Sequence, residues 1–188
     1  MKKLWIVLGV IAVIIFMVFN WYQSGYNSMI ALNEQVKSSW AQVENQLQRR
    51  FDLVPNLVNT VKGYANHEEK IFTEVTKLRS QWGQAATVPE KVDVANQLSA
   101  AMGRLLMVSE NYPQLKADQG FLELQSQLEG TENRIAVERM RYNQSAQQFN
   151  TYRQSFLGRL FAGQTGLNQE AAYFKAEQQA QQTPKVSF

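Results

Sequence analysis

The sequence predicts an all-α protein, with an N-terminal transmembrane helix followed by an elongated antiparallel helical bundle of long heptad-patterned helices. Three observations predict this fold class. A stretch near the N-terminus has no charged or strongly polar side chain in sixteen positions, and apolar residues then recur at every seventh position along much of the chain. No segment shows the alternation that is typical of a strand. Helices with a single apolar stripe must bury it against a partner, so the pattern indicates a bundle.

Segment 1–25 is the predicted membrane anchor, because it contains the apolar stretch from Leu4 to Phe19. As a helix this stretch rises about 24 Å, and the residues after it extend the span toward the roughly 30 Å of a hydrocarbon core. Trp5 at one end and Trp21 and Tyr22 at the other lie where an aromatic belt forms. A cleaved secretory signal peptide is the alternative, although the residues that follow match a cleavage site poorly. A lipid-modified cysteine is excluded because the chain has no Cys.

The orientation of this span depends on few charges. Lys2 and Lys3 precede it, and Lys37 is the only basic residue within about twenty positions after it. The positive-inside tendency therefore favours a cytoplasmic N-terminus and an extracytoplasmic bulk domain. A cytoplasmic domain stays open as the alternative, because a chain without cysteine fits either compartment.

The predicted first helix of the bundle covers residues 26–82. Pro55 lies within it, at a cost of roughly 3 kcal/mol for a helix interior. The seven-residue phase survives Pro55, so the sequence favours one kinked helix. The alternative is a break, with Asp52 as the N-cap of a new helix and Pro55 in its first turn. Two apolar series, interrupted only by Arg50 and Glu68, carry the pattern: Met29, Val36, Val43, Leu57, Tyr64, Ile71 and Leu78, and Trp40, Leu47, Val54, Val61, Val75 and Trp82.

A shorter helix follows the first pattern. "GQAATVPE" (83–90) supplies the glycine, threonine and proline of a connection, and the next helix is predicted over 90–111. Pro113 then interrupts the pattern. Whether the chain reverses at Pro113 or only bends there stays open.

A second long helix is predicted over 118–157, with Asp118 as its N-cap. Apolar residues recur in it at every seventh position from Phe121 to Phe156. We assign residues 26–160 to the bundle domain. Segment 161–188 then forms a short C-terminal helix and tail, because the glycines of "GRLFAGQTG" break the long helix and "LNQEAAYFKAEQQAQQ" has a helical composition.

Charge and residue chemistry exclude several function classes. The pI is about 9.1, but the formal charge of +3 falls to +1 without the two anchor lysines, so no basic footprint for nucleic acid is present. The single histidine, His67, is interpreted as a solvated helix residue, and the Glu-x-x-His pairs of a bundle metal site are missing. No nucleophile elbow or P-loop occurs. We therefore expect no enzyme activity, catalytic residue, cofactor or metal.

Charged residues near the two long seams form the remaining candidate site. Arg49 and Arg50 precede the proline, and Arg50 falls on the seam itself. Glu132 and Glu138 lie near the seam of the later long helix. Pairing of Arg50 or Arg49 with one of these carboxylates would fix the helix register. The alternative is that these residues form a partner surface.

Three segments carry a resemblance to a known family. They are "YNSMIALNEQVKSSWAQVENQLQRRFDLVPNLVNTVKGYANHE" (26–68), "ENYPQLKADQGFLELQSQLEGTENRIAVERMRYN" (110–143) and the ending "TPKVSF" (183–188). With an apolar stretch in the expected place, the chain resembles the LemA family of bacterial single-span membrane proteins over nearly its whole length.

The resemblance implies a single-pass protein of the bacterial cytoplasmic (inner) membrane with an elongated antiparallel bundle. It implies no enzymatic activity, cofactor or catalytic residue. Related members are associated with magnetosome membrane formation and, through gene neighbourhood, with a membrane zinc metalloprotease of the heat-shock type. The family assigns no agreed role to the residues that carry its motifs here, which are Arg49, Arg50, Asp52, Pro55, Asn56, Lys62, Glu132, Asn133 and Arg134.

The favoured functional hypothesis is a non-enzymatic, membrane-anchored helical scaffold of the bacterial envelope. It would contact the lipid bilayer through its span and self-associate there as a homo-oligomer, since tethering raises the effective concentration of neighbouring copies. The alternative is an adaptor of a membrane zinc metalloprotease or an envelope signalling protein. An enzyme or metal carrier is the third hypothesis.

Overall fold

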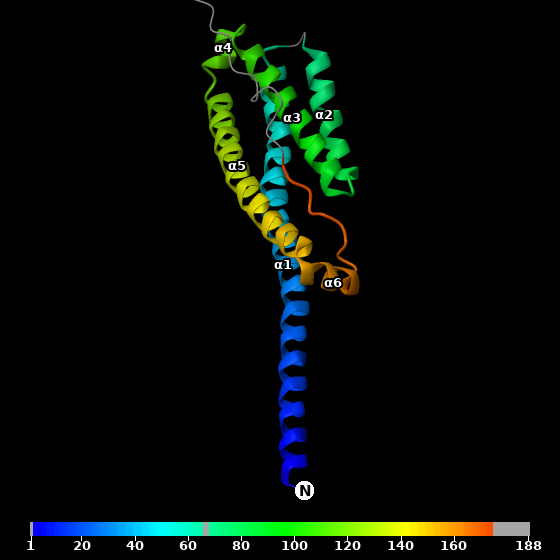
Figure 1. Ribbon diagram of the computed structural model, residues 1–188. Helices are drawn as coiled ribbons and strands as arrows, with labels where there is room; N and C mark the ends of the chain where they lie inside the picture. The colour runs from blue at the N-terminus through cyan, green and yellow to red at the C-terminus, as the bar shows by residue number, and fades with distance from the viewer. Residues whose placement is uncertain (1, 66–67, 175–188) are drawn as a thin grey trace, which may run out of the picture. The chain divides into compact units, whose positions relative to one another are not determined.

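The computed structural model describes residues 2–65 and 68–174, and within these residues the chain is helical with no strand (Figure 1). The predicted all-α class is therefore confirmed. The helices are α1 (Lys2–Lys62), α2 (Glu69–Gln84), α3 (Val88–Ser109), α4 (Pro113–Lys116), α5 (Gln119–Gln154) and α6 (Phe156–Thr165).

The chain forms two compact units, and the two long helices contribute to both. Unit 1 contains residues 1–40 and 141–173, which include the first part of α1, the end of α5 and α6. Unit 2 contains residues 41–140 together with the segment that begins at Phe174.

The core of unit 2 consists of the apolar seams that the sequence shows. On α1 the side chains of Val43, Leu47, Val54, Leu57 and Val61 are buried, and α2, α3 and α5 cover them with their own buried stripes. Each fully buried side chain of this size contributes about 1.5–3 kcal/mol. The heptad periodicity therefore identified the inner face of α1, α2, α3 and α5. It failed at Tyr64, which is exposed, and at Phe156, which is exposed and lies beyond the end of α5 at Gln154, where the predicted helix 118–157 already stops. The large buried residues of the covering helices include Phe72, Val75, Leu78, Leu98, Met102, Leu105, Phe121, Leu128 and Ile135.

The predicted single helix over 26–82 is wrong, because α1 ends at Lys62 and α2 begins at Glu69. The Tyr64 and Ala65 N–H groups both donate to the Val61 carbonyl, at 3.0 and 2.9 Å, and close the last turn. The seven-residue phase continues across this turn because Val75, Leu78 and Trp82 on α2, which belong to the two apolar series, are buried in the same core. The continuing seven-residue spacing therefore indicates that α1 and α2 share one core. It does not indicate that they form one unbroken helix.

Pro55 does not interrupt α1, so the alternative break with Asp52 as an N-cap does not form. Pro55 lacks the N–H that would reach the Phe51 carbonyl. Burial of Val54 and Leu57 on the two sides of the proline offsets this loss. Packing of the apolar face therefore keeps α1 helical through Pro55.

The connection to α3 is closed by a capping box. Thr87 is the N-cap, its hydroxyl accepts from the Glu90 N–H, and the Glu90 carboxylate accepts from the Thr87 N–H. The backbone N–H of Thr87, followed by that of Ala86, donates to the Glu90 carboxylate, and these two bonds hold the pKa of Glu90 below its usual value. Because Pro89 occupies the first turn, where no N–H is needed, α3 begins at Val88, slightly before the predicted 90–111.

The chain reverses between α3 and α5, which answers the question left open at Pro113. In the contacts between α1 and α3 the residue numbers increase together, as in Glu44 with Lys91 and Arg50 with Ser99, so these two helices run in the same direction. In the contacts between α1 and α5 the numbers increase on one side and decrease on the other, as in Arg50 with Glu132 and Tyr64 with Asp118, so these helices are antiparallel. The short helix α4, which begins at Pro113, lies at this reversal.

Asp118 caps α5, as the sequence predicts, because its Oδ1 accepts from the Phe121 N–H at 2.9 Å. This backbone bond is the largest cause that lowers the pKa of Asp118, and a hydrogen bond from the Tyr64 hydroxyl adds to it. The same bond raises the pKa of Tyr64. Asp118 therefore ties the start of α5 to the end of α1.

We expect the stability of the full chain to fall as the pH drops below the ordinary values of about 3.8 for Asp118 and 4.5 for Glu90. A carboxylate with a lowered folded pKa stabilises the fold above its unfolded pKa and loses that contribution on protonation. Asp118→Asn keeps a capping side chain, so it should reduce this acid sensitivity with little effect near neutral pH. Thermal melts of both proteins across the acidic range measure the difference. An unchanged acid dependence in Asp118→Asn would contradict the assignment.

The end of the chain differs from the prediction in two places. The glycine segment "GRLFAGQTG" was expected to be a break, yet most of it lies in α6. Residues 167–174 were expected to begin a helix but are irregular, and the rest of that predicted helix lies outside the described residues. Ser155 explains the first difference. It ends α5 and starts α6 as its N-cap, where its hydroxyl accepts from the Gly158 N–H at 3.0 Å. Gly166 ends α6 with a φ of 73°, a conformation that suits glycine.

Unit 1 has its own small core at the junction of α1, α5 and α6. Met29, Phe149, Phe161 and Ala162 are buried in it. The Asn150 amide fixes the segment after α6, since its Nδ2 donates to the Ala171 carbonyl and its Oδ1 accepts from the Ala171 N–H, both at 2.9 Å. The irregular segment therefore returns along α5.

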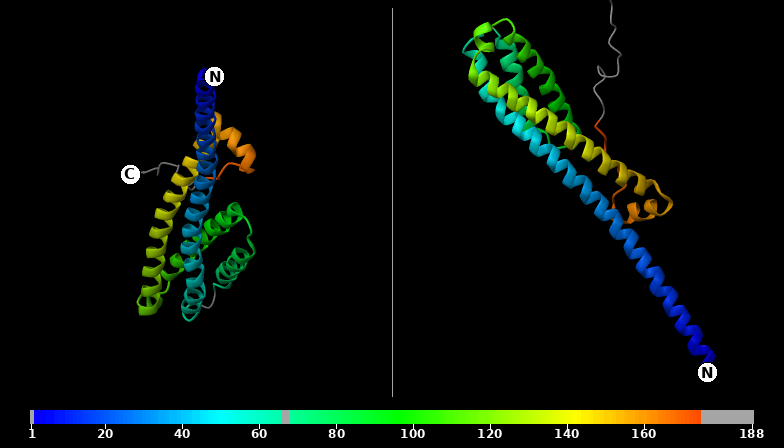
Figure 2. Two further views of the ribbon diagram at one scale, coloured as in Figure 1. Left: turned by 90° about the horizontal axis from the view of Figure 1, so that it is seen from below. Right: turned by 90° about the vertical axis from the view of Figure 1, so that its left-hand side faces the viewer.

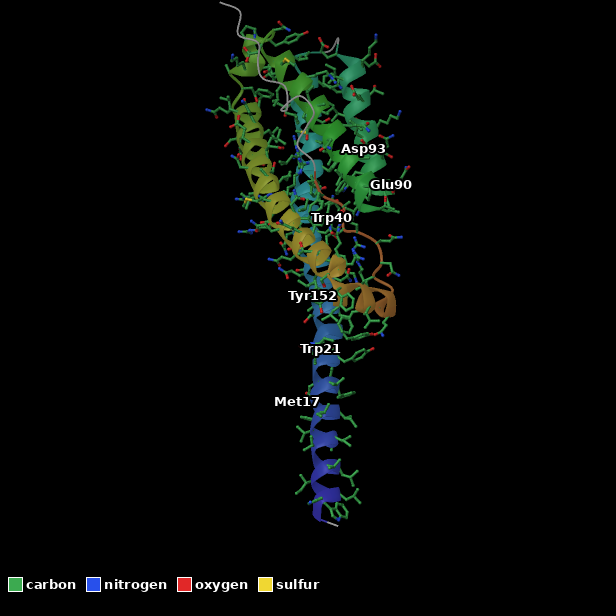
Figure 3. The ribbon with its side chains drawn as sticks, in the orientation of Figure 1. Met17, Trp21, Trp40, Glu90, Asp93 and Tyr152 are labelled. Carbon is green, nitrogen blue, oxygen red and sulfur yellow. The ribbon has the colours of Figure 1, made fainter. Side chains whose placement is uncertain are left out.

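The apolar stretch Leu4–Phe19 lies outside both cores. Its large side chains are exposed, and Figure 3 shows Met17 within the stretch and Trp21 just beyond it. Within the described residues, α1 is the helix that is long and apolar enough to cross a membrane. These properties fit a single-pass membrane protein.

Candidate functional site

A buried arginine joins three helices in the core of unit 2. The Arg50 side chain on α1 is 8% exposed, and its Nη1 donates to Ser99 Oγ on α3 at 2.9 Å and to Glu132 Oε2 on α5. Ser99 Oγ in turn donates to the Ala95 carbonyl at 3.0 Å. The hydroxyl therefore receives one hydrogen bond and donates one, which suits a group inside a bundle.

The two charged members of this cluster differ in their exposure to solvent. The Glu132 side chain is 47% exposed, whereas Arg50 is buried. Glu132 thus retains part of its hydration, and the desolvation cost falls mainly on the guanidinium. Arg50 can reach both the Ser99 hydroxyl and the Glu132 carboxylate only when α1, α3 and α5 are aligned along their lengths as they are here. The geometry suits a register-setting contact.

A second polar cluster surrounds Trp82 at the end of α2. Its indole Nε1 donates to Gln48 Oε1 at 2.9 Å, and its ring stacks on Phe51 with centroids 4.6 Å apart. The Lys91 ammonium lies 5.5 Å from the Trp82 ring and also pairs with Glu44. The sequence places Trp82 on a seam but gives no signal for Lys91, whose partners lie far away along the chain.

The junction of α1 and α6 in unit 1 is a third arrangement, which sequence reasoning missed. The Phe161 ring packs edge-on against Tyr22 with centroids 5.5 Å apart, and it lies directly over Gly25. The Tyr22 hydroxyl donates to Gln164 Oε1, and the Tyr152 hydroxyl donates to the Gly25 carbonyl at 2.8 Å. Gly25 is required here because a Cβ would lie 2.3 Å from the Phe161 ring.

The described residues contain no group of three or more His, Cys, Asp or Glu side chains that could hold a metal ion. His67 lies outside the described residues. The polar clusters around Arg50 and Trp82 consist of groups that bond to one another across helices. Their chemistry is that of structural contacts between helices.

Comparison with known proteins identifies the family. A model of the LemA family matches residues 39–188, which is most of the chain and covers both clusters of unit 2.

The chain belongs to the LemA family.

Two kinds of relative share the LemA assignment of this chain. Magnetosome protein MamQ 2 of Paramagnetospirillum magneticum is 25% identical over 188 aligned positions, covering 86% of this chain and 68% of the relative. Magnetosome protein MamQ of Magnetospirillum gryphiswaldense is 24% identical over 66% of this chain and 56% of its own length. Protein LemA of Metamycoplasma hominis is 22% identical over 69% of this chain and 60% of its own length. None of these names denotes a known enzyme.

The LemA motif residues of α1 separate into one buried and several exposed positions. Arg50 is the buried member, and Pro55 is half-buried. Asp52 is exposed and accepts from Gln48 Nε2 at 2.9 Å. The Lys62 ammonium lies 5.4 Å from the centre of the Phe72 ring and supports the turn between α1 and α2. Arg49 and Asn56 are exposed on the same side of α1 as Asp52, because the three lie at positions i, i+3 and i+7.

The LemA motif residues of α5 separate in the same way. Glu132 points to the arginine cluster, while Asn133 and Arg134 are exposed. Glu138, six residues after Glu132, is half-buried. The structure thus pairs Arg50 with Glu132, one of the pairings that the sequence suggested, and leaves Arg49 without an ion pair in the described part of the chain. The role of this pair stays a proposal.

Proposed function

We propose that this LemA protein is a non-enzymatic, membrane-anchored helical scaffold of the bacterial envelope that self-associates at the membrane. The observation that carries the proposal is the continuity of α1. One helix, Lys2–Lys62, contains the exposed apolar stretch and also supplies buried side chains to the cores of both units. A bilayer that holds the stretch would therefore hold unit 1 through the same helix, which continues without a break into its core.

The contacts of Tyr22 support an anchor over a cleaved signal peptide. A signal peptide is removed at an accessible segment after its apolar region. Here the chain remains helical through that region, and Tyr22 is bound by Phe161 and Gln164. Removal of the apolar stretch near this point would destroy contacts of the unit 1 core.

An exposed polar stripe on α1 supports self-association. Asn45, Arg49, Asp52, Asn56 and Asn59 are all exposed and recur at intervals of four and three, so they form one line along the helix. The line carries one cation and one anion. Such a surface complements itself in a two-fold arrangement, where Arg49 of each copy faces Asp52 of the other. Confinement to a bilayer strengthens weak contacts of this kind.

Charge exchange within the stripe tests the scaffold. Arg49→Glu in the full-length protein should weaken assembly about tenfold, because two acidic residues would then face each other across copies. The double variant Arg49→Glu with Asp52→Arg should restore assembly, since it keeps the complementarity with the signs reversed. Light scattering of the detergent-solubilised protein after size exclusion measures the oligomer.

The control for charge alone is Lys77→Glu, at an exposed position of α2 away from the stripe. It should leave the oligomer unchanged. A parent protein that is monomeric at high concentration would refute self-association. If Lys77→Glu weakens assembly as much as Arg49→Glu does, the stripe is not the interface, although the protein still self-associates.

A role as partner of a membrane zinc metalloprotease or an envelope signalling protein is the competing proposal. The same exposed stripe could bind another protein instead of a second copy. Crosslinking in membranes followed by purification under denaturing conditions separates the two. Recovery of a protease whose crosslinks depend on Arg49 would favour the adaptor, and recovery of the chain crosslinked only to itself would favour the scaffold.

A further inference from the structure

The outer side of the short helix α6 carries two exposed apolar residues. Phe156 is 92% exposed and Leu160 is 52% exposed. The two residues are four positions apart, so they lie one above the other on one side of the helix. The inner side of α6 buries Phe161 and Ala162 in the unit 1 core. The helix therefore has apolar residues on an outer side that no described side chain covers.

Contacts within unit 1 fix the position of this apolar side. Phe161 and Gln164 bind Tyr22, which follows the apolar stretch of α1 almost directly. Figures 1 and 2 show α6, in orange, beside α1 just beyond that stretch. A helix bound at this point lies within reach of the surface of any bilayer that holds the stretch.

The direction of the apolar side follows from the neighbours of α6. Gly158 faces the end of α5, where a Cβ would lie 1.7 Å from the Tyr152 carbonyl oxygen. Leu160 lies about 160° around the helix from Gly158, because successive residues turn by about 100°. Gln164 shares the side of Leu160 and reaches Tyr22, which is nearer to the apolar stretch than Gly25 is. The side with Leu160 and Phe156 therefore faces away from α5 and toward the apolar stretch.

The residues beside the apolar side suit a lipid surface. Arg159 is exposed and lies at one edge of it, where a long cationic side chain can keep its head among phosphates while its stem contacts apolar groups. Trp21, which is 53% exposed, lies in the adjoining turn of α1, at the level where aromatic residues gather in membranes. Helices that lie in the interface combine Phe and Leu on one side with basic residues beside them.

We propose that α6 is an interfacial helix whose Phe156 and Leu160 side chains enter the boundary between lipid headgroups and acyl chains. Arg159 then meets the lipid phosphates, and α6 holds unit 1 against the bilayer at a second point. This proposal rests on the apolar stretch spanning a bilayer, but it does not depend on self-association or on any protein partner.

Single-cysteine labelling tests the proposal, and the chain offers a clean background because it has no cysteine. Phe156→Cys, Leu160→Cys, Ile11→Cys and Gln147→Cys would each carry an environment-sensitive fluorophore on the full-length protein. All four positions are exposed, so labelling should not disturb a core. The labelled proteins would be placed in liposomes of phosphatidylcholine and phosphatidylglycerol. A nitroxide quencher would be carried on the lipid either near the headgroup or near the end of the acyl chain.

The expected result is a depth order. Ile11, in the middle of the apolar stretch, should lose most of its fluorescence with the deep quencher. Positions 156 and 160 should lose most of theirs with the shallow quencher, and position 147 on α5 should lose little with either. Quenching at Ile11 with none at 156 and 160 would overturn the interfacial helix and leave the span intact. Absence of quenching at Ile11 would refute the span itself, and the interfacial helix with it.

Discussion

Phe161→Ala should release α6 from unit 1, with a loss of about 3–5 kcal/mol in the local free energy of unfolding. The ring is 1% exposed, packs against Tyr22, and covers the bare backbone of Gly25. Its removal leaves a cavity that the rigid helices α1 and α5 cannot close. Hydrogen–deuterium exchange of the full chain should show faster exchange in α6 and in the segment through Ala171.

Phe156→Ala is the matched control, because it removes the same side chain from the same helix at a position that is 92% exposed. Without a bilayer, in detergent, the loss there should stay within about 0.5 kcal/mol. Equal effects of the two substitutions on exchange would contradict the packing of α6 against α1. Faster exchange confined to Phe161→Ala would support it.

Glu132→Ala should destabilise unit 2 by about 2 kcal/mol, because it removes the carboxylate that neutralises the buried Arg50 guanidinium. The expected loss is below the 3–5 kcal/mol typical of a fully buried pair, since water already reaches Glu132. Arg50→Met should be close to neutral, because an apolar side chain fits the seam. The double variant should then resemble Arg50→Met alone. Denaturant unfolding of the four proteins in detergent gives the coupling energy.

A suitable control is Glu74→Ala, whose partner Arg104 and own side chain are each 47% exposed. Such a surface pair should contribute less than about 1 kcal/mol. The register hypothesis adds a second readout. Arg50→Met should show extra sets of peaks in a two-dimensional NMR spectrum if the arginine selects one alignment of the helices. A single set of peaks at full stability would contradict that role.

The sequence predicted the class of the fold and the inner face of the long helices from local information, although Phe156 at the end of the last series proved exposed. Apolar side chains at every seventh position require a helix and a seam regardless of what covers the seam, so Leu47, Val54 and Leu57 could be placed inside before any partner was known. The cap at Asp118 is equally local, because it needs only the three residues that follow. The exposed stretch before Tyr22 was visible from composition.

The positions at which the chain turns were less predictable. The pattern passed through the turn after Lys62 without a phase change, because α2 enters the same core as α1. Glycines in "GRLFAGQTG" suggested a break, whereas Gly158 is needed where α6 meets the Tyr152 carbonyl. A glycine that allows a close approach and a glycine that ends a helix look alike in one sequence.

The sequence by itself therefore determined which side chains must leave water: the seams of the bundle and the apolar stretch of α1. Only the tertiary structure decided which distant groups meet. It gave Arg50 a hydroxyl on α3 besides the carboxylate on α5, and it placed Phe161 over Gly25. The physical reason is that hydrophobic periodicity is a property of neighbouring residues, whereas a hydrogen bond or a ring contact between distant helices depends on how their backbones are brought together.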